Sequence, residues 1–280
     1  MAKLVRSVTV AATLAWLTLN GLTHADEPFP AHCVVGNVYY VGSKQRASYL
    51  ITTPDGHILI NSSFEETVPL IRVAVESLGF KFIDVKILLA SHAHSDHVAG
   101  HALIKEQTGA KVYVLRGDDE TIGSGGKGQY LYKDNRWKPC PVDRVLVDGD
   151  QVQLGAETLV ARRTPGHTRG CTTWTWQAAA DGKNYDVVVI GSPNVNPGYR
   201  LVKNADYPEI AEDFAKTFAT LKSLPCDVFL GAHGDYYGLL AKHQRIGQGS
   251  NPFIDPEGYK GYVDLKEKAF RRTLAEQSAP

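Results

Sequence analysis

The most restrictive feature of the sequence is a short, mainly apolar run at residues 85–90 that leads directly into a cluster of polar residues. A run of this length and composition is typical of a strand that is buried on both faces of a sheet. Such a sheet must be covered by helices or by a second sheet. The polar cluster, residues 91–97, then lies at the end of the strand, where open α/β sheets commonly build their sites.

Strand and helix patterns follow one another in two similar halves of the chain. In the first half, the apolar spacing predicts helices at 68–78 and 98–107 and strands at 37–41, 47–51, 57–60 and 111–115. In the second half, it predicts helices at 208–223 and 263–274 and strands at 144–147, 158–162, 172–176, 186–190 and 227–230. This order favours an α/β sandwich with sheets inside and helices outside. We expect residues 26–280 to fold as a single domain.

The first 25 residues have the pattern of a secretory signal peptide. Lys3 and Arg6 give a positive start, residues 8–19 are apolar and uncharged, and Ala25 completes a segment with small residues at the cleavage positions. A membrane anchor is the alternative, but this run of 12 residues is short of the ~20 that a spanning helix needs. We therefore expect cleavage after Ala25, export to the periplasm, and no membrane attachment of the mature chain.

The composition excludes several classes of protein. Lysine and arginine total 30, and aspartate and glutamate also total 30, so the chain has no net charge that would attract a nucleic acid. Removal of residues 1–25 takes away two basic residues and no acidic one, which leaves 28 basic and 30 acidic residues and a charge of −2. A hydrophobic fraction of 43% fits a globular protein with a buried core. We therefore expect no nucleic-acid partner.

Three histidines and one aspartate directly follow the predicted strand at 85–90. They are His92, His94, Asp96 and His97. Solvated loop histidines are the alternative interpretation, which would be the better one for a single histidine. A cluster of four instead indicates a metal site, since neutral imidazoles and carboxylates are zinc ligands. We expect His92 and His94 to face one ion, and Asp96 and His97 to face a second ion after the chain turns.

Two further histidines lie at the ends of predicted strands. His167 lies in a Thr-Pro-Gly-His-Thr turn between two strands, and His233 lies in a Gly-Ala-His-Gly segment after the strand at 227–230. With the cluster at 91–97 they make five histidines and one aspartate, which is three ligands for each of two ions. Three protein ligands leave a coordination position for water, as is typical of catalytic zinc.

The order His-x-His-x-Asp-His at 92–97, then His167, then His233, resembles the metallo-β-lactamase superfamily over essentially the whole mature chain. This resemblance implies an αββα sandwich, in which two mixed sheets are flanked by helices and two zinc ions lie at one edge. The superfamily also includes glyoxalase II-like thioesterases, lactonases, nucleases and sulfatases. The motif alone therefore does not identify the substrate.

Ser192, at the end of the predicted strand 186–190, helps to separate these activities. Thioesterase and lactonase relatives usually place a metal-bridging aspartate there, and two β-lactamase subclasses place a cysteine ligand. A serine hydroxyl is a poor zinc ligand, so the chain resembles subclass B3. The implied ligands are His92, His94 and His167 for one zinc, and Asp96, His97 and His233 for the other. By the same resemblance, Ser192 and Asn196 bind the substrate carboxylate, and Tyr199 either approaches the carbonyl oxygen or simply packs. Residues 196–198 are also an ordinary turn sequence.

The resemblance implies a monomer that acts on a small-molecule substrate. It also implies opening of the β-lactam ring of penicillins, cephalosporins and carbapenems, and hence resistance to these antibiotics. Hydroxide formed from water between two zinc ions attacks the lactam carbonyl, and Asp96 orients that water or accepts its proton. One alternative is a lactonase or thioesterase with incidental β-lactam turnover, against which Ser192 argues. Another is an exported zinc-binding protein with a degenerate site, against which the complete set of ligand positions argues.

The four cysteines and one glycine-rich stretch carry weaker signals. In subclass B3, a cysteine matching Cys226 often forms a disulfide near the C-terminus, but Tyr259 occupies the partner's place here. The sequence leaves open the pairing of the other three, Cys33, Cys140 and Cys171. Residues 123–128 are rich in glycine but lack the spacing of a phosphate-binding loop, which favours a loop beside the site.

Overall fold

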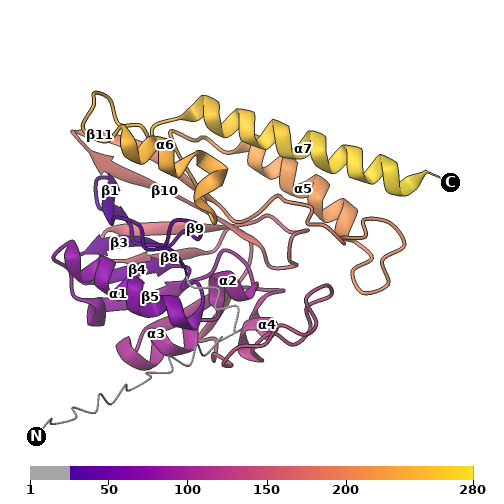
Figure 1. The fold of residues 1–280 in the computed structure, drawn as a ribbon, viewed down its shortest axis with the longest axis horizontal. Coiled ribbons are helices and arrows are strands. Elements are labelled where there is room, and N and C mark those ends of the chain that lie inside the picture. The colour runs from indigo at the N-terminus through magenta and orange to yellow at the C-terminus, as the bar shows by residue number, and fades with distance from the viewer. Residues whose placement is uncertain (1–25, 280) are drawn as a thin grey trace, which may run out of the picture.

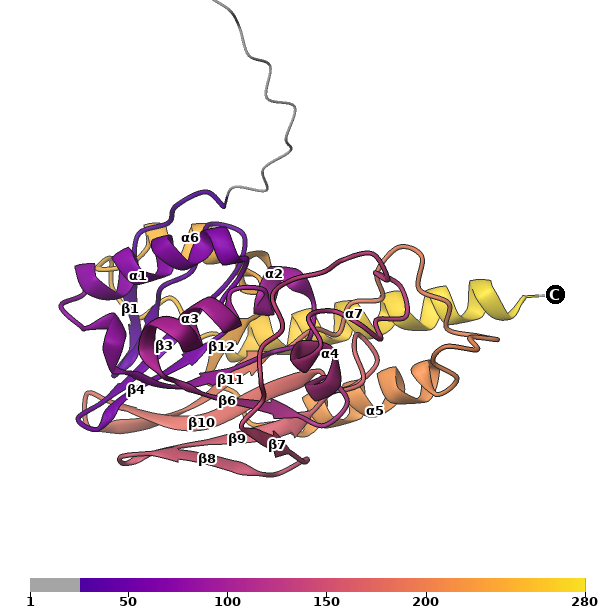
Figure 2. The ribbon, with the colours of Figure 1, turned by 90° about the horizontal axis from the view of Figure 1, so that it is seen from below.

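Two β-sheets pack against each other, and helices cover the outer face of each sheet (Figure 1, Figure 2). The computed structural model describes residues 26–279, and the predicted signal peptide lies outside the described residues. The arrangement confirms the αββα sandwich that was predicted from the sequence. Among the helices of the described residues, none is both long and apolar enough to cross a membrane.

The first sheet contains seven strands in the order of the sequence. They are β1 (His32–Val35), β2 (Val38–Tyr40), β3 (Tyr49–Thr53), β4 (Gly56–Ile60), β5 (Val85–Leu89), β6 (Lys111–Leu115) and β7 (Arg144–Leu146). The pairs from β1 to β4 are antiparallel, and those from β4 to β7 are parallel. In β5, Ile87 and Leu89 face the second sheet, whereas Leu88 faces the helices. The prediction that this strand is buried on both faces is confirmed.

The second sheet contains five strands in the order β12-β11-β10-β9-β8. Their bounds are β8 (Gln151–Leu154), β9 (Glu157–Arg163), β10 (Thr172–Ala180), β11 (Lys183–Ile190) and β12 (Val228–Gly231). The pair β11·β12 is parallel and the other pairs are antiparallel. Both sheets are therefore mixed, as expected.

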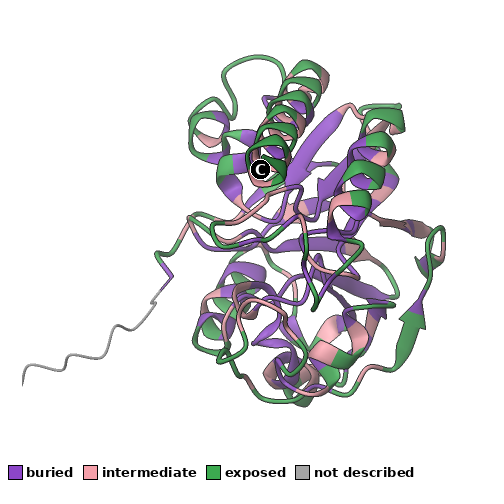
Figure 3. Cartoon of the chain, turned by 90° about the vertical axis from the view of Figure 1, so that its right-hand side faces the viewer, coloured by how far each residue is buried: buried purple, intermediate pink, exposed green. Residues whose placement is uncertain are grey.

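Helices lie on both outer surfaces. They are α1 (Val68–Ser77), α2 (Ser95–Val98), α3 (His101–Thr108), α4 (Asp119–Gly123), α5 (Ile210–Ser223), α6 (Leu239–Gln244) and α7 (Pro256–Ser278), with short 3₁₀ turns η1 (Glu65–Thr67), η2 (Phe82–Asp84) and η3 (Gly234–Tyr237). α1 and α3 pack on the first sheet through Ile71, Val75 and Ile104. On the second sheet, Phe214 of α5 stacks on Phe270 of α7 at 5.5 Å between ring centroids. Figure 3 shows the buried residues on the sheets and on the inner faces of these helices.

The last helix is longer than predicted. Its apolar spacing predicts a start at Val263, but α7 begins at Pro256, because Pro256 lies in the first turn and the Asp255 side chain accepts a hydrogen bond from Gly258 N at 2.8 Å. Exposed polar residues in the first turns hide the helical period. Cap residues were the better signal for this boundary.

Tyr259 lies where the resemblance implied a disulfide partner for Cys226. Its hydroxyl donates to the Leu221 carbonyl at 2.7 Å, and its ring packs edge-on against Phe229. All four cysteines are free. The hydrogen bond from the buried Tyr259 to Leu221 therefore joins α7 to the end of α5, in place of a disulfide.

Candidate metal centre

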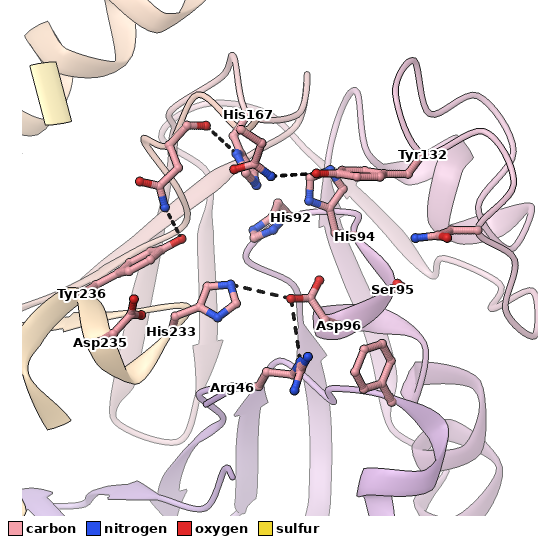
Figure 4. Close-up of a pocket in the computed structure, with 14 residues that line it drawn as sticks. Arg46, His92, His94, Ser95, Asp96, Tyr132, His167, His233, Asp235 and Tyr236 are labelled. Carbon is pink, nitrogen blue, oxygen red and sulfur yellow. Dashed lines mark hydrogen bonds and ion pairs between the residues drawn. The ribbon is translucent and has the colours of Figure 1, made fainter. Parts of the chain in front are cut away.

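Six candidate ligands meet at one edge of the two sheets, where several chain segments turn away from their strands. Figure 4 shows His92, His94, Asp96, His167 and His233, and His97 completes the set. His92 and His94 follow β5, and Asp96 and His97 lie on α2. His167 lies in the turn between β9 and β10, and His233 follows β12. Residues separated by up to 141 positions in the sequence thus share one site, as the motif predicted.

The first triad consists of His92, His94 and His167. One ligand atom from each ring lies within 4.8 Å of the others, and all three side chains are buried. The Asn194 carbonyl accepts a hydrogen bond from His167 Nδ1 at 2.8 Å, so this nitrogen carries the proton and Nε2 keeps its lone pair. A hydrogen bond of this kind orients a ligand ring in most histidine–metal sites.

The second triad consists of Asp96, His97 and His233. His97 Nε2 lies 3.1 Å from His233 Nε2, and Asp96 Oδ2 lies 3.4 Å and 3.6 Å from these two nitrogens. These separations define a common point about 2 Å from each atom, which is the usual distance of zinc from such ligands. The donors and their spacing therefore fit zinc.

The two triads adjoin each other. His92 lies within reach of Asp96 and His97 as well as of His94 and His167, since both sets have ligand atoms within 4.8 Å of one another. The ring centroids of His92 and His97 are 4.1 Å apart. Two metal ions held by these triads would be neighbours and would act on the same bound molecule.

Burial favours the neutral imidazole at four of the ligand positions, His92, His94, His97 and His167. Desolvation lowers the pKa of His94 to about 3 and that of His167 to about 4. It also holds the pKa values of His92 and His97 well below their usual range, and the neighbouring histidines act in the same direction. Neutral rings offer a free lone pair at physiological pH, as metal binding requires.

Asp118 fixes the two loops that carry the first triad. Its buried carboxylate accepts hydrogen bonds from Ala93 N at 2.8 Å, from Gly170 N at 2.9 Å and from the Thr168 hydroxyl at 2.7 Å. Burial raises the pKa of Asp118 to about 6, and these three hydrogen bonds oppose the rise. Ala93 lies between His92 and His94, and Thr168 follows His167. The Asp118 carboxylate therefore holds the two ligand-bearing loops at a fixed distance from each other.

Asn61 plays a similar part for the other end of the histidine cluster. Its backbone φ is +64°, a left-handed conformation that asparagine adopts more readily than most residues. The side chain accepts a hydrogen bond from Ser91 N at 2.8 Å and donates to the Ala47 carbonyl at 3.3 Å. It thereby ties the start of the histidine loop to β4 and to the segment before β3.

Gly166 allows the His167 turn to pack tightly. Its φ is +119°, and a Cβ atom at this position would lie 2.7 Å from the ring of Phe214 on α5. A larger residue would have to displace that buried ring or move the turn. The glycine before the ligand is therefore required both by its backbone conformation and by the close contact with α5.

A cavity of about 410 Å³ opens beside the candidate ligands. Besides five of the ligands, its walls contain Arg46, Phe64, Ser95, Tyr132, Asn135, Asn194, Asn196, Asp235 and Tyr236. The volume suits a small molecule. Both candidate triads reach this cavity, which makes it the place where a substrate would meet the metal centre.

The three predicted substrate-binding residues have different positions. Asn196 lies in the cavity wall and donates a hydrogen bond to the Tyr132 hydroxyl at 2.9 Å. Ser192 is buried behind the wall, with its hydroxyl 3.1 Å from that of Tyr236, so it is placed to orient Tyr236. Tyr199 is also buried, and its hydroxyl donates to the His167 carbonyl at 2.8 Å. Binding of substrate by these residues stays a prediction.

Sequence reasoning missed Arg46, Tyr132 and Tyr236, which line the cavity. Tyr132 belongs to the segment between α4 and β7, and its ring meets His94 edge-on at 4.9 Å between centroids. The glycine-rich stretch had indicated a loop beside the site without indicating which side chain reaches it. Tyr236 lies three residues after His233, so proximity to that ligand was an available signal.

Known proteins share this fold. The family model of the metallo-beta-lactamase superfamily matches residues 41–179. The native FEZ-1 metallo-beta-lactamase from Legionella gormanii is 48% identical in sequence, and the match covers 91% of this chain and 99% of that one with a TM-score of 0.89. The chain therefore belongs to the metallo-beta-lactamase superfamily. Its strong structural matches are to subclass B3 enzymes, such as the class B3 di-zinc metallo-beta-lactamase LRA-12 from an Alaskan soil metagenome, which is 32% identical over 90% of this chain and 97% of its own, with a TM-score of 0.85.

Curated sequence relatives include a different activity. A hydroxyacylglutathione hydrolase from Cereibacter sphaeroides is 34% identical over 83 residues, which are 30% of this chain and 26% of that hydrolase. The chain spans between 26% and 45% of the lengths of three curated relatives, a probable metallo-hydrolase and two hydroxyacylglutathione hydrolases. These matches support the shared hydrolase fold.

Proposed function

We propose that this chain is an exported zinc-dependent β-lactamase that uses two zinc ions to open the ring of penicillins, cephalosporins and carbapenems. The observation that carries the proposal is the pair of adjoining triads at one cavity, together with Ser192 in place of a bridging acid. Ser192 is turned toward Tyr236, so within the described residues this strand end supplies neither a carboxylate nor a thiolate to the site. The likeness to subclass B3 enzymes over nearly the whole chain supports the same activity.

The chain's own residues account for binding and proton transfer. Zinc ions bound by the two triads supply Lewis acidity and a water of lowered pKa. Asp96 would hold one ion through Oδ2, which lies 3.4 Å from His97 Nε2, and its other carboxylate oxygen would be free to orient that water and take up its proton. Tyr132 and Asn196 form one wall of the cavity and are joined there by a hydrogen bond.

A substrate panel tests the proposal. Zinc-loaded mature protein is expected to hydrolyse a penicillin, a cephalosporin and a carbapenem with kcat/KM of about 10⁴–10⁸ M⁻¹s⁻¹, the usual range for enzymes. Loss of absorbance of the lactam at fixed zinc content measures this directly. The proposal fails if fully loaded protein opens none of the three rings.

A thioesterase is the second candidate, and the hydroxyacylglutathione hydrolase relative is the observation that favours it. The same protein is therefore assayed on a glutathione thioester and on a simple lactone. We expect turnover of these substrates to be at least about 100-fold slower than that of the best β-lactam, a difference of about 2.7 kcal/mol in activation free energy. A reversed ranking would replace the β-lactamase by the thioesterase or lactonase.

Export to the periplasm belongs to the same proposal, because β-lactam targets lie outside the cytoplasm. Cells expressing the full chain are expected to hold a periplasmic protein that begins at Asp26 and to gain resistance to β-lactams. Mass spectrometry of the protein from periplasmic extract measures the new N-terminus. An uncleaved protein retained in the cytoplasm would contradict this part of the proposal.

A further inference from the structure

Arg46 is the one lysine or arginine among the described residues that line the cavity. It lies in the segment between β2 and β3 and comes beside Asp96, as Figure 4 shows. Its side chain is 20% exposed, so the charge lies largely within the protein at the edge of the cavity. A cation placed there is a contact for an anionic substrate.

The guanidinium of Arg46 is held in one position. One end of it, Nη1, pairs with Asp26, and its Cζ lies 4.6 Å above the ring of Phe64. Asp26 is itself fixed, because its fully buried carboxylate also accepts hydrogen bonds from the Ser63 and Thr67 hydroxyls at 2.7 Å and 2.6 Å. An arginine held in this way loses little conformational freedom when it binds a ligand.

The other edge of the guanidinium has donors to spare. Arg46 Nε is buried and has no hydrogen-bond partner. Asp96 Oδ2 lies 3.9 Å from it, which is too far for a hydrogen bond, and the proposed site commits Asp96 to a metal ion. Nε and Nη2 form the paired donors that match the two oxygens of a carboxylate. A buried donor without a partner is costly, and an incoming carboxylate would relieve that cost.

We propose that Arg46 binds a carboxylate of the substrate through this free edge. The inference rests on the proposed function, since it concerns the same cavity. Every penicillin carries a carboxylate on its bicyclic nucleus. Some penicillins carry a second carboxylate on the side chain. The chemistry of recognition is the same for both.

Two penicillins that differ by one carboxylate identify which group Arg46 binds. They are benzylpenicillin and its α-carboxy derivative, assayed on zinc-loaded wild-type protein and Arg46→Gln. We expect KM to rise about tenfold or more in the variant, with a much smaller change in kcat, because a charge-assisted contact to the bound substrate is lost. An equal rise for both penicillins assigns the contact to the nuclear carboxylate, and a rise for the α-carboxy derivative alone assigns it to the side chain.

Arg46→Lys is the matched control. It keeps the charge and the ion pair with Asp26 but lacks the paired donors, so its KM should lie between those of wild type and Arg46→Gln. Thermal melting and zinc content are measured for each protein. An unchanged KM for both penicillins overturns the proposal, and so does an effect explained by loss of zinc, which would make Arg46 a positioning residue for Asp96.

A binding measurement separates this inference from the proposed function. Isothermal titration of chelator-treated protein with each intact penicillin needs no turnover, and the intact ligand carries no carboxylate besides the nuclear and side-chain groups. Binding that weakens in Arg46→Gln supports the contact even if wild-type protein hydrolyses neither penicillin, in which case the proposed function alone fails. Equal affinities in wild type and Arg46→Gln, or no binding by wild type, overturn the inference.

Discussion

Asp96→Asn is expected to lower kcat/KM for β-lactam hydrolysis by a factor of about 10²–10⁴, the range found when a positioned acid–base group is removed. The amide keeps the size of the side chain but carries no charge, so it is a weaker ligand beside His97 and His233. It also cannot accept a proton from the attacking water. Steady-state kinetics at saturating zinc, with zinc content measured on the same samples, check this expectation.

A second aspartate provides the control for loss of charge. Asp181 is an exposed residue in the turn between β10 and β11, with a φ of +50° that asparagine tolerates well. Asp181→Asn should keep the activity and zinc content of the wild type. An Asp96→Asn variant that retains more than about a tenth of the activity would show that this carboxylate is neither an essential ligand nor the proton acceptor.

Asp118→Ala is expected to lower the free energy of unfolding by at least about 3 kcal/mol, because each buried donor left without an acceptor costs about 1–3 kcal/mol. Three donors lose their acceptor in this variant: Ala93 N, Gly170 N and the Thr168 hydroxyl. The loops that carry His92, His94 and His167 also lose their common anchor, so the affinity for zinc should fall. Urea denaturation of the metal-free protein and competition with a chromogenic chelator measure the two effects separately.

The neighbouring Asp119 is the matched control for Asp118. Its side chain accepts a hydrogen bond from Gly117 N at 2.8 Å in an exposed turn. Asp119→Ala should therefore change the free energy of unfolding by no more than about 1 kcal/mol. If Asp118→Ala is equally mild, the three hydrogen bonds do not hold the metal-binding loops together.

Much of the fold could be predicted because apolar periodicity reports burial. The run at 85–90 is β5, and the stripe that begins at Ile210 is the buried face of α5. β1 and β8 were not predicted, since their short segments lack clear alternation over enough residues. The start of α7 was misplaced because its first turns are polar on most sides, and the helix is held there by its cap.

The candidate ligands could be predicted because a cluster of histidines and an aspartate is unusual in a loop. Four of the six lie within residues 92–97. The cavity wall could not be predicted in the same way. Arg46 and Tyr132 lie far from every histidine in the motif, and the folding of their segments brings them to the site. Ser192 was predicted to bind the substrate carboxylate, and the structure places its hydroxyl 3.1 Å from that of Tyr236, behind the cavity wall.

The measurement that tests the central claim most directly is a zinc titration of chelator-treated protein, followed by the rate of β-lactam hydrolysis at each step. Two adjoining triads predict negligible activity without metal, and a rise to a plateau as the bound zinc reaches about two ions per chain, one for each set of three ligands. Full activity in the metal-free protein, or no activity with both sites filled, would contradict the account.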